Sequence, residues 1–473
     1  MAVQPQVPTL TAPWLPRRAL ALTAGGVGSA AMAAMAIISL RIVTAAAHRP
    51  KTYVPSGRHG LPDWMAGPLR GYGSPLGLRG LSTLLIAMGA LYLLVLVCSR
   101  WIPVWAAITG AVVMVVLFTV APPLFSTDIF NYVAYARMGT LHHINPYVYG
   151  PAAIGGDPSV PLSGRIWMHT PTAYGPLFTL VSYAFVPLGV AGTMWALKGL
   201  VGVAALGCAA LVWLCARRLG VRPVPAMLFF VLNPLLLVYA VGGGHNDVLM
   251  ALPLLAGAFL ILDGKPELGG AALAAAIAIK VTAGVVLPFV LVASSQRWRV
   301  LAGAAVTAAV VAVLAFAAFG PHVLSVVNLL QHHDQFTKPI LNVPGYLSYA
   351  LDHGTLTPAG HHVLELVFDA GALLLLVVAW RRRDWLAAGA AALLLLLVTL
   401  GWLLPWYVVW VLPLAPLARQ RWLPVGVMAL TAVMVAIQIH IYDVHAERQL
   451  KQLHAHVSHQ AGLPGPRLLG KGG

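Results

Sequence analysis

Residues 81–121 read LSTLLIAMGALYLLVLVCSRWIPVWAAITGAVVMVVLFTVA and contain a single charged side chain, that of Arg100. An α-helix needs about 20 consecutive apolar residues to cross the hydrocarbon core of a bilayer. The stretch supplies two such runs, 81–98 and 102–121, on either side of Arg100. It therefore predicts two membrane-spanning helices joined by a short basic turn.

The same pattern continues through the rest of the chain. Of its 473 residues, 59% are hydrophobic and only 9% are charged, whereas a soluble domain carries about 25% charged residues. The run at 268–294 predicts two short helices or one broken helix. The first apolar run is longer than the core of about 7–15 residues of a signal peptide, so we interpret it as a retained span. Further predicted spans lie at 19–40, 194–216, 224–241, 247–263, 299–319, 364–380, 385–403, 406–418 and 422–441.

These runs predict an all-α polytopic membrane protein, a helix bundle of about 11–14 spans. We expect residues 1–441 to form one transmembrane domain. It includes two large outer loops, 122–193 and 320–362, and the first of them carries short interfacial helices. Residues 442–473 are polar and rich in histidine, and we expect them to form a loosely ordered tail.

The net charge of +16 does not indicate nucleic-acid binding, because no basic stripe follows a polar face. Short basic clusters stand between the apolar runs instead, and such clusters mark loops that stay in the cytoplasm. If both Arg100 and Arg217 are cytoplasmic, 174–193 is not a crossing but lies along the outer interface. The loops 122–172 and 242–247 then share the outer surface. The clusters are Arg17-Arg18, Arg100, Arg217-Arg218 with Arg222, Arg297 with Arg299, Arg381-Arg382-Arg383, and Arg419 with Arg421.

Asp128 is one of only 13 acidic residues, and it stands just past a predicted span. Ser126 or Thr127 can cap a short helix that begins there, and Tyr132 and Tyr135 then follow Asp128 on the same helix face. One interpretation is that Asp128 is an interfacial helix cap. The other is that its carboxylate is a general base.

Two further polar features interrupt the apolar runs. His245-Asn246-Asp247 follow three glycines, which either form an ordinary turn or let the backbone approach another group closely. Lys280 stands alone in an apolar stretch, where a charge costs about 2.5–3.5 kcal/mol. We expect it to meet an anionic partner, such as a lipid phosphate, at a helix break. No residue at ligand spacing completes a metal site with His245 and Asp247, so no metal and no other cofactor is expected.

Around these residues the chain resembles a known family. The stretches are DIFNY at 128–132, NPYVYGP at 145–151, AYGP at 173–176, LNPL at 232–235, GGGHNDVLM at 242–250, IKVTAG at 279–284 and LPWY at 404–407. Together they resemble the actinobacterial polyprenol-phosphate-mannose-dependent alpha-(1→6)-mannosyltransferases of lipomannan synthesis, within the GT-C superfamily. The chain departs from that pattern at Tyr135, where the family tends to have Gln, and at Ala173, where a Pro is usual.

The resemblance implies an inverting glycosyltransferase with a GT-C-like helix bundle. It moves a sugar, with mannose as the first expectation, from a polyprenyl-phosphate donor to a glycolipid or glycan acceptor. The site lies at the outer face of the plasma membrane, among membrane lipids. The sequence agrees, because it contains no soluble domain for a nucleotide sugar, and an outer-face transferase then needs a lipid-carried donor.

An oxocarbenium-like transition state with a phosphate leaving group requires one base, and it requires positive charge near the phosphate. Asp128 suits the base. We expect Lys280, Tyr174, His245 and Asn246 to bind the donor and its phosphate. Tyr132, Asp247, Trp406 and Tyr407 are assigned to the sugar or the acceptor.

Two alternatives remain open from the sequence. One is a GT-C enzyme that uses another polyprenyl-phosphate sugar, such as arabinose or glucose. The other is a polytopic transporter or lipid flippase, which also has broken helices and intramembrane charge. A transporter predicts inverted repeats and a polar site near the midplane, whereas the polar residues here collect in outer loops.

Overall fold

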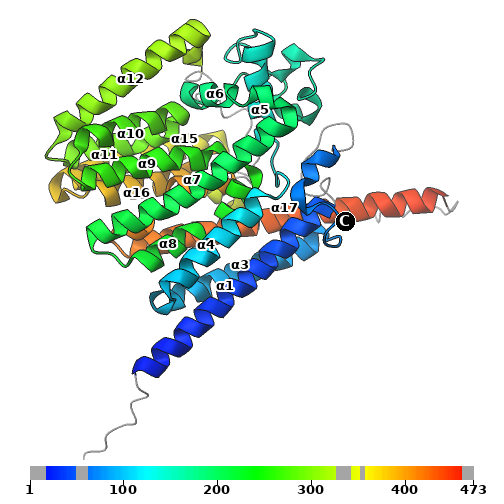
Figure 1. The fold of residues 1–473 in the computed structure, drawn as a ribbon, viewed down its shortest axis with the longest axis horizontal. Helices are drawn as coiled ribbons and strands as arrows, with labels where there is room; N and C mark the ends of the chain where they lie inside the picture. Colours follow the sequence, from blue (N-terminus) through cyan, green and yellow to red (C-terminus); the bar gives the residue numbers. More distant parts are fainter. Residues whose placement is uncertain (1–16, 49–61, 326–341, 352–356, 461–473) are drawn as a thin grey trace, which may run out of the picture.

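The fold is that of a computed structural model, which describes residues 17–48, 62–325, 342–351 and 357–460 (Figure 1). No β-strand occurs in these ranges. Six of the described helices are long and apolar enough to cross a membrane, which confirms the predicted all-α polytopic membrane protein. They are α1 (Arg17–His48), α3 (Leu78–Cys98), α7 (Gly189–Leu219), α12 (Arg297–Phe319), α15 (Pro358–Arg382) and α17 (Trp422–Gln460).

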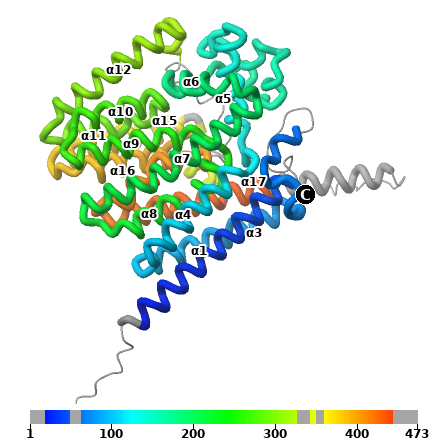
Figure 2. Tube along the Cα trace, viewed as in Figure 1, coloured from blue at the N-terminus to red at the C-terminus, as the bar shows by residue number. Residues whose placement is uncertain are grey.

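Shorter apolar helices fill the bundle between these six. Figure 2 shows α1, α3 and α4 packed together along one side, and α9 and α10 pack against α7 and α12. One continuous apolar core joins the bundle, and it contains α8 and η7 almost entirely. The shorter helices are α4 (Val104–Thr119), α8 (Pro223–Val231), η7 (Leu236–Val241), α9 (Asn246–Leu262), α10 (Pro266–Ile279), α11 (Val286–Ala293) and α16 (Trp385–Thr399).

Several helices are broken within the bundle. The predicted break in 268–294 is confirmed: α10 ends at Ile279, and Lys280 is extended with φ −152° and ψ 124°. The prediction of one continuous span at 224–241 is wrong, because Pro234 has no N–H to continue the helix. There the Asn233 side chain accepts from the Leu235 N–H at 3.0 Å.

The predicted span at 406–418 is also not a regular α-helix. It consists of two short 3₁₀ segments, η11 (Pro405–Trp410) and η12 (Ala415–Leu417). Pro413 and Pro416 interrupt the hydrogen bonds that a continuous helix needs. After Tyr442 the chain continues as helix α17 to Gln460, so a loosely ordered tail does not begin at 442.

Within the predicted outer loop 320–362, the described parts include two short helices, η9 (Gly320–Leu324) and α14 (Val343–Ala350), and the first turn of α15. Most of 326–356 lies outside the described residues. In the loop 122–193, α5 (Asp128–Leu141) and α6 (Pro176–Tyr183) are joined by short 3₁₀ turns. With eight residues, α6 is about 12 Å long. It is too short to cross a membrane, which agrees with the prediction that 174–193 is not a membrane crossing.

The basic clusters gather at one end of the bundle. Arg218 pairs with Asp263, and Arg299 pairs with Glu267. These contacts join the C-terminal end of α7 to α9, and the start of α10 to α12. The helices α5 and α6 lie at the other end, at the upper right of Figure 1. The fold therefore separates a basic end from an end that carries Asp128.

Candidate functional site

A cavity opens at the end of the bundle that carries α5. Asp128 and Lys280 both line it, and so do Tyr174, Trp406 and Tyr407. These side chains come from the start of α5, the turn before α6, the break after α10 and the first turn of η11. The fold thus brings residues more than 270 positions apart in the sequence into one site. Five of the site residues predicted from the sequence line this cavity.

Asp128 is the first residue of α5, and the N-cap residue, Thr127, makes no side-chain capping hydrogen bond. The Ser126 hydroxyl accepts from the Asp128 N–H at 3.1 Å. The Asp128 carboxylate is 16% exposed, and its described partner is Nδ1 of His245 at 3.4 Å. That distance is longer than an ordinary hydrogen bond. The carboxylate is therefore left available to the cavity, while the Ser126 hydroxyl satisfies the first N–H group of α5.

His245 is fully buried behind Asp128. Its ring stacks on Trp406, with centroids 3.6 Å apart and an interplanar angle of 15°. Gly244 before it has φ +74°, and a Cβ there would lie 2.6 Å from Cδ1 of Ile129. Gly244 also donates its N–H to the Val241 carbonyl at 3.1 Å, so this position is both a turn and a close approach, and the structure does not select between the two interpretations.

Lys280 has an anionic partner, as expected, and that partner is a protein carboxylate. Its Nζ donates to Oδ1 of Asp247 at 2.6 Å, and the Trp410 indole donates to the same oxygen at 2.5 Å. The ammonium also lies 4.9 Å from the centroid of the Tyr407 ring. The Lys280 side chain is 15% exposed and Asp247 is 1% exposed. The lysine therefore faces the cavity while the carboxylate supports it from behind.

Tyr174 is held beside Lys280 by a close backbone approach. The Gly175 N–H donates to the Ile279 carbonyl at 3.0 Å. A Cβ on Gly175 would lie 2.1 Å from the carbonyl oxygen of Ala278. Only glycine permits this contact, which joins the start of α6 to the end of α10.

Several buried polar atoms around Asp128 have no hydrogen-bond partner among the described residues. Most buried polar groups in proteins are paired, so these atoms leave hydrogen-bonding capacity beside Asp128 that the described side chains do not use. The atoms are Oδ1 of Asn131, both ring nitrogens of His245, Nδ2 of Asn246 and Oδ2 of Asp247.

Tyr132 and Tyr135 lie on α5 beside Asp128. Tyr132 is buried against Tyr174, with ring centroids 4.7 Å apart, and its hydroxyl accepts from the Asn246 N–H at 3.4 Å. Burial and then the negative charge of Asp128 raise the pKa of Tyr132, Tyr135 and Tyr174. These phenols therefore stay neutral hydrogen-bond donors.

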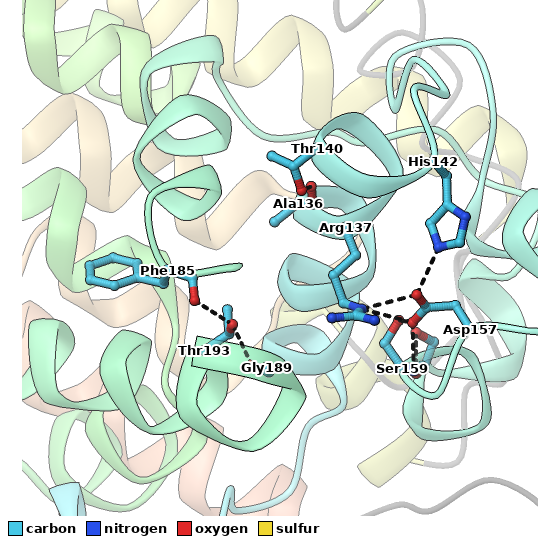
Figure 3. Close-up of polar contacts among 10 residues, drawn as sticks. Ala136, Arg137, Thr140, His142, Asp157, Ser159, Phe185, Gly189 and Thr193 are labelled. Atoms are coloured by element: carbon cyan, nitrogen blue, oxygen red, sulfur yellow. Dashed lines mark hydrogen bonds and ion pairs between the residues drawn. The ribbon is translucent and has the colours of Figure 1, made fainter. Parts of the chain in front are cut away.

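A polar clamp fixes the loop that follows α5 (Figure 3). Arg137 donates through Nε to both oxygens of Asp157, at 2.9 and 3.0 Å. Nε2 of His142 lies 2.8 Å from Asp157, and the Ser159 hydroxyl donates to it at 2.7 Å. Burial opposes ionisation of Asp157, but the hydrogen bonds from Arg137, His142 and Ser159 outweigh it and lower the pKa of the carboxyl.

The structure thus divides the predicted site residues into two groups. Asp128, Lys280, Tyr174, Trp406 and Tyr407 line the cavity. Tyr132, His245, Asn246 and Asp247 are buried directly behind them. Sequence reasoning did not single out other residues of the site, which are Asn131, Trp167, Trp402, Trp410 and Lys198.

Of these residues, Lys198 carried a recognisable signal, because it is a lone charge in an apolar run. It is fully buried, and its Nζ donates to the carbonyls of Gly242 at 2.6 Å and Phe118 at 3.1 Å. It thereby ties the glycine turn before His245 to the end of α4. No three His, Cys, Asp or Glu side chains gather as a metal-binding group in the described ranges. The expectation of no metal stays a prediction.

The fold and the cavity define a multi-pass, all-α membrane protein with a polar site at one end of its bundle. Residues 23–296, more than half of the chain, match the family described as "alpha-(1→6)-mannopyranosyltransferase, N-terminal domain", and the chain belongs to this family. The resemblance inferred from the sequence is thereby confirmed.

Three curated relatives give the same family name. An alpha-(1→6)-mannopyranosyltransferase A of Mycobacterium tuberculosis is 38% identical over 177 residues, which cover 35% of this chain and 33% of the relative. A probable alpha-(1→6)-mannopyranosyltransferase of Mycolicibacterium smegmatis is 35% identical over 150 residues, 31% of this chain and 27% of the relative. An alpha-(1→6)-mannopyranosyltransferase A of Corynebacterium glutamicum is 32% identical over 184 residues, 37% and 36% of the two chains. The matches therefore cover about a third of each relative's length. No solved structure matches this chain.

Proposed function

We propose that this protein is an inverting mannosyltransferase of the GT-C type, which moves mannose from a polyprenyl-phosphate donor to a glycan or glycolipid acceptor. The family match and the named relatives support mannose as the sugar. The observation that carries the proposal is that one cavity holds a carboxylate without a capping function, Asp128, and an ammonium group, Lys280.

In the proposed reaction, Asp128 is the general base. The acceptor hydroxyl attacks the anomeric carbon from the side opposite the phosphate, and its proton passes to the Asp128 carboxylate. A new C–O bond forms as the bond between the anomeric carbon and the phosphate oxygen breaks, and polyprenyl phosphate leaves with the electron pair. A positioned base contributes about 10²–10⁴-fold to the rate of such a step.

Lys280 stabilises the leaving phosphate in this scheme. An ammonium group has three N–H donors, and Asp247 accepts one of them. The other two remain for the phosphate oxygens, while Asp247 and the Tyr407 ring hold the ammonium in place. Charge stabilisation of this kind is effective because the donors are preorganised in a site that excludes water.

A second cavity, of about 370 Å³, suits the acceptor. Thr127, Asp128, Arg165 and Trp406 line it, whereas Lys280 lines only the first cavity. Asp128 therefore lies where the two cavities meet. The donor reaches the base from the side of Lys280, and the acceptor hydroxyl reaches it from the side of Arg165.

The site belongs to the outer face of the plasma membrane in this proposal. The basic end of the bundle is the cytoplasmic end by the positive-inside rule, and α5, which begins with Asp128, lies at the opposite end. A lipid-linked donor suits this location, because its chain stays in the bilayer while its sugar phosphate enters the cavity from the side.

Asp128→Asn tests the proposal directly. The substitution keeps the size of the side chain but removes its ability to accept a proton. We expect the purified variant to bind polyprenyl-phosphate mannose normally while its turnover falls by about 10²–10⁴-fold. Turnover is measured with purified protein and a panel of polyprenyl-phosphate mannose, arabinose and glucose donors.

Ser126→Ala is the matched control, because it removes a hydrogen bond to the backbone of the same turn. We expect it to lower the free energy of unfolding by about 0.5–1.5 kcal/mol and to lower turnover far less than Asp128→Asn does. Wild-type turnover in Asp128→Asn would show that Asp128 is not the base. Asp247 would then be the next carboxylate to test.

A further inference from the structure

A third cavity, of about 620 Å³, lies at the basic end of the bundle. Three arginines from separate segments line it: Arg100 after α3, Arg222 before α8, and Arg421 before α17. The sequence separates Arg100 from Arg421 by more than 300 positions, so the tertiary fold alone brings them together. None of the described residues that line the cavity is acidic.

No described acidic residue balances the positive charge of this cavity. Arg218 and Arg299, at the same end, pair with Asp263 and Glu267. Within the described ranges no ion pair involves any of the three lining arginines. The Arg100 guanidinium instead stacks over the Trp101 ring, 3.6 Å from its centroid. The N-termini of α8 and α17 lie beside this cavity, and so does the C-terminus of α3, so the helix dipoles partly cancel and the positive potential comes from the arginines.

Apart from Ser99, the rest of the cavity wall is apolar. It includes Leu96, Phe229 and Met428, and Phe229 is only 5% exposed. Basic groups and an apolar wall in one cavity are complementary to a molecule with an anionic head and a hydrocarbon chain. A free anion would not need the apolar wall, and an uncharged hydrocarbon chain would not need the basic groups.

We propose that this cavity is a binding site for an anionic phospholipid, whose phosphate contacts Arg100, Arg222 and Arg421 and whose acyl chain lies on the apolar wall. Basic pockets between transmembrane helices bind anionic lipid head groups, and such lipids are abundant in the cytoplasmic leaflet. The site lies at the end opposite Asp128. It takes no part in the proposed transfer reaction and does not depend on it.

Native mass spectrometry of the full chain, with added phosphatidylglycerol or phosphatidylcholine, tests the proposal. We expect wild-type protein to retain phosphatidylglycerol in preference to phosphatidylcholine. The triple variant Arg100→Gln, Arg222→Gln, Arg421→Gln is expected to bind phosphatidylglycerol about tenfold more weakly or worse, since each basic residue near the surface strengthens such binding several-fold.

The matched control removes the same charge from the same end but outside the cavity: Arg217→Gln, Arg297→Gln, Arg419→Gln. It should keep phosphatidylglycerol affinity within about twofold of wild type. An equal loss in both triple variants, or no loss in either, overturns the proposal. Competition with inorganic phosphate separates the two phosphate sources: displacement of the lipid by phosphate at millimolar concentration would show a free-phosphate site and overturn the lipid assignment. If the first triple variant does not fold, the single pair Arg421→Gln and Arg419→Gln gives the same comparison.

Discussion

At the scale of single residues, Asp247 determines what Lys280 can do. A buried carboxylate and a buried ammonium stabilise each other, and each is costly when the other is removed. Their hydrogen bond of 2.6 Å lies beside the cavity rather than in it. The ion pair therefore stabilises the fold. This structural role must be separated by experiment from the proposed role of Lys280 in binding the donor phosphate.

The two roles of Lys280 can be separated with the single variants Lys280→Met and Asp247→Asn and with the double variant that combines them. Each single substitution leaves an unpaired buried charge and should lower the free energy of unfolding by about 3–5 kcal/mol. The double variant removes both charges, so its loss should be smaller than the sum of the two. If Lys280 binds the donor phosphate, donor affinity should still be lost in the double variant. Thermal unfolding and donor binding are measured on the same samples. Normal donor affinity in the double variant would confine Lys280 to a structural role.

The Asp157 clamp gives a prediction about pH. Because the fold lowers the pKa of Asp157, its stabilisation is fully present above the ordinary value near 3.9. It is lost as the pH falls through the lower folded value. Asp157→Asn should therefore cost about 1.5–3 kcal/mol of stability at neutral pH, and this cost should shrink below pH 4. Melting temperature against pH for both proteins checks this. A difference that vanishes between pH 7 and 5 would contradict it.

The sequence predicted the charged residues of the site better than the aromatic ones. A lone charge in an apolar run is costly, so Asp128 and Lys280 stand out from the sequence alone. Trp167 and Trp402 do not, although their rings stack 5.8 Å apart at the cavity. Tryptophans are common at both membrane interfaces, and only tertiary contacts show which of them meet.

At the scale of elements, the breaks in the helices build the site. Each break exposes backbone groups that a regular helix would pair. The break at Lys280 was predicted from the sequence, whereas the break at Asn233-Pro234 and the short segments of 405–417 were not predicted, although their prolines were a signal for them. In those two cases the apolar composition alone suggested a continuous span, and the prolines inside the runs decided the local structure.

The contact of Gly175 with the end of α10 holds α6 against α10. In Gly175→Ala, a Cβ 2.1 Å from the Ala278 carbonyl forces α6 away from α10. We expect a stability loss of about 1–3 kcal/mol and at least a tenfold loss of donor affinity, because Tyr174 moves away from Lys280. Gly156→Ala is the control, since a Cβ there meets nothing within 4 Å. Thermal unfolding and donor binding are the measurements. If the two variants have the same stability and the same donor affinity, the contact between α6 and α10 does not position Tyr174 for donor binding.

At the scale of the whole molecule, the bundle has two chemically different ends. Helix α12 connects them: it has 23 residues and is about 35 Å long. Arg297 begins it at the basic end, and the Phe319 carbonyl at its other end accepts from the Asn145 side chain at 2.7 Å. The sequence predicted this separation from the basic clusters alone, because each cluster follows or precedes an apolar run.

Cysteine labelling tests how the two ends are oriented in the membrane. Ala153 is exposed in the loop after α5, and Ser295 is exposed between α11 and α12. The three native cysteines, Cys98, Cys208 and Cys215, are buried and are first replaced. In intact cells, a membrane-impermeant maleimide should label Ala153→Cys, because positive charge keeps the basic end in the cytoplasm. Ser295→Cys should react only after the membrane is opened.

Each outcome of this labelling bears on a different feature of the protein. Labelling of Ser295→Cys alone from outside would place Asp128 in the cytoplasm and overturn the outer-face transferase, although the cavity itself would stand. Labelling of both positions from outside would contradict the separation of the two ends across the membrane. The expected pattern leaves the Asp128 cavity facing the side where a lipid-linked sugar is the accessible donor. It also leaves Arg100, Arg222 and Arg421 facing the leaflet that is rich in anionic lipid.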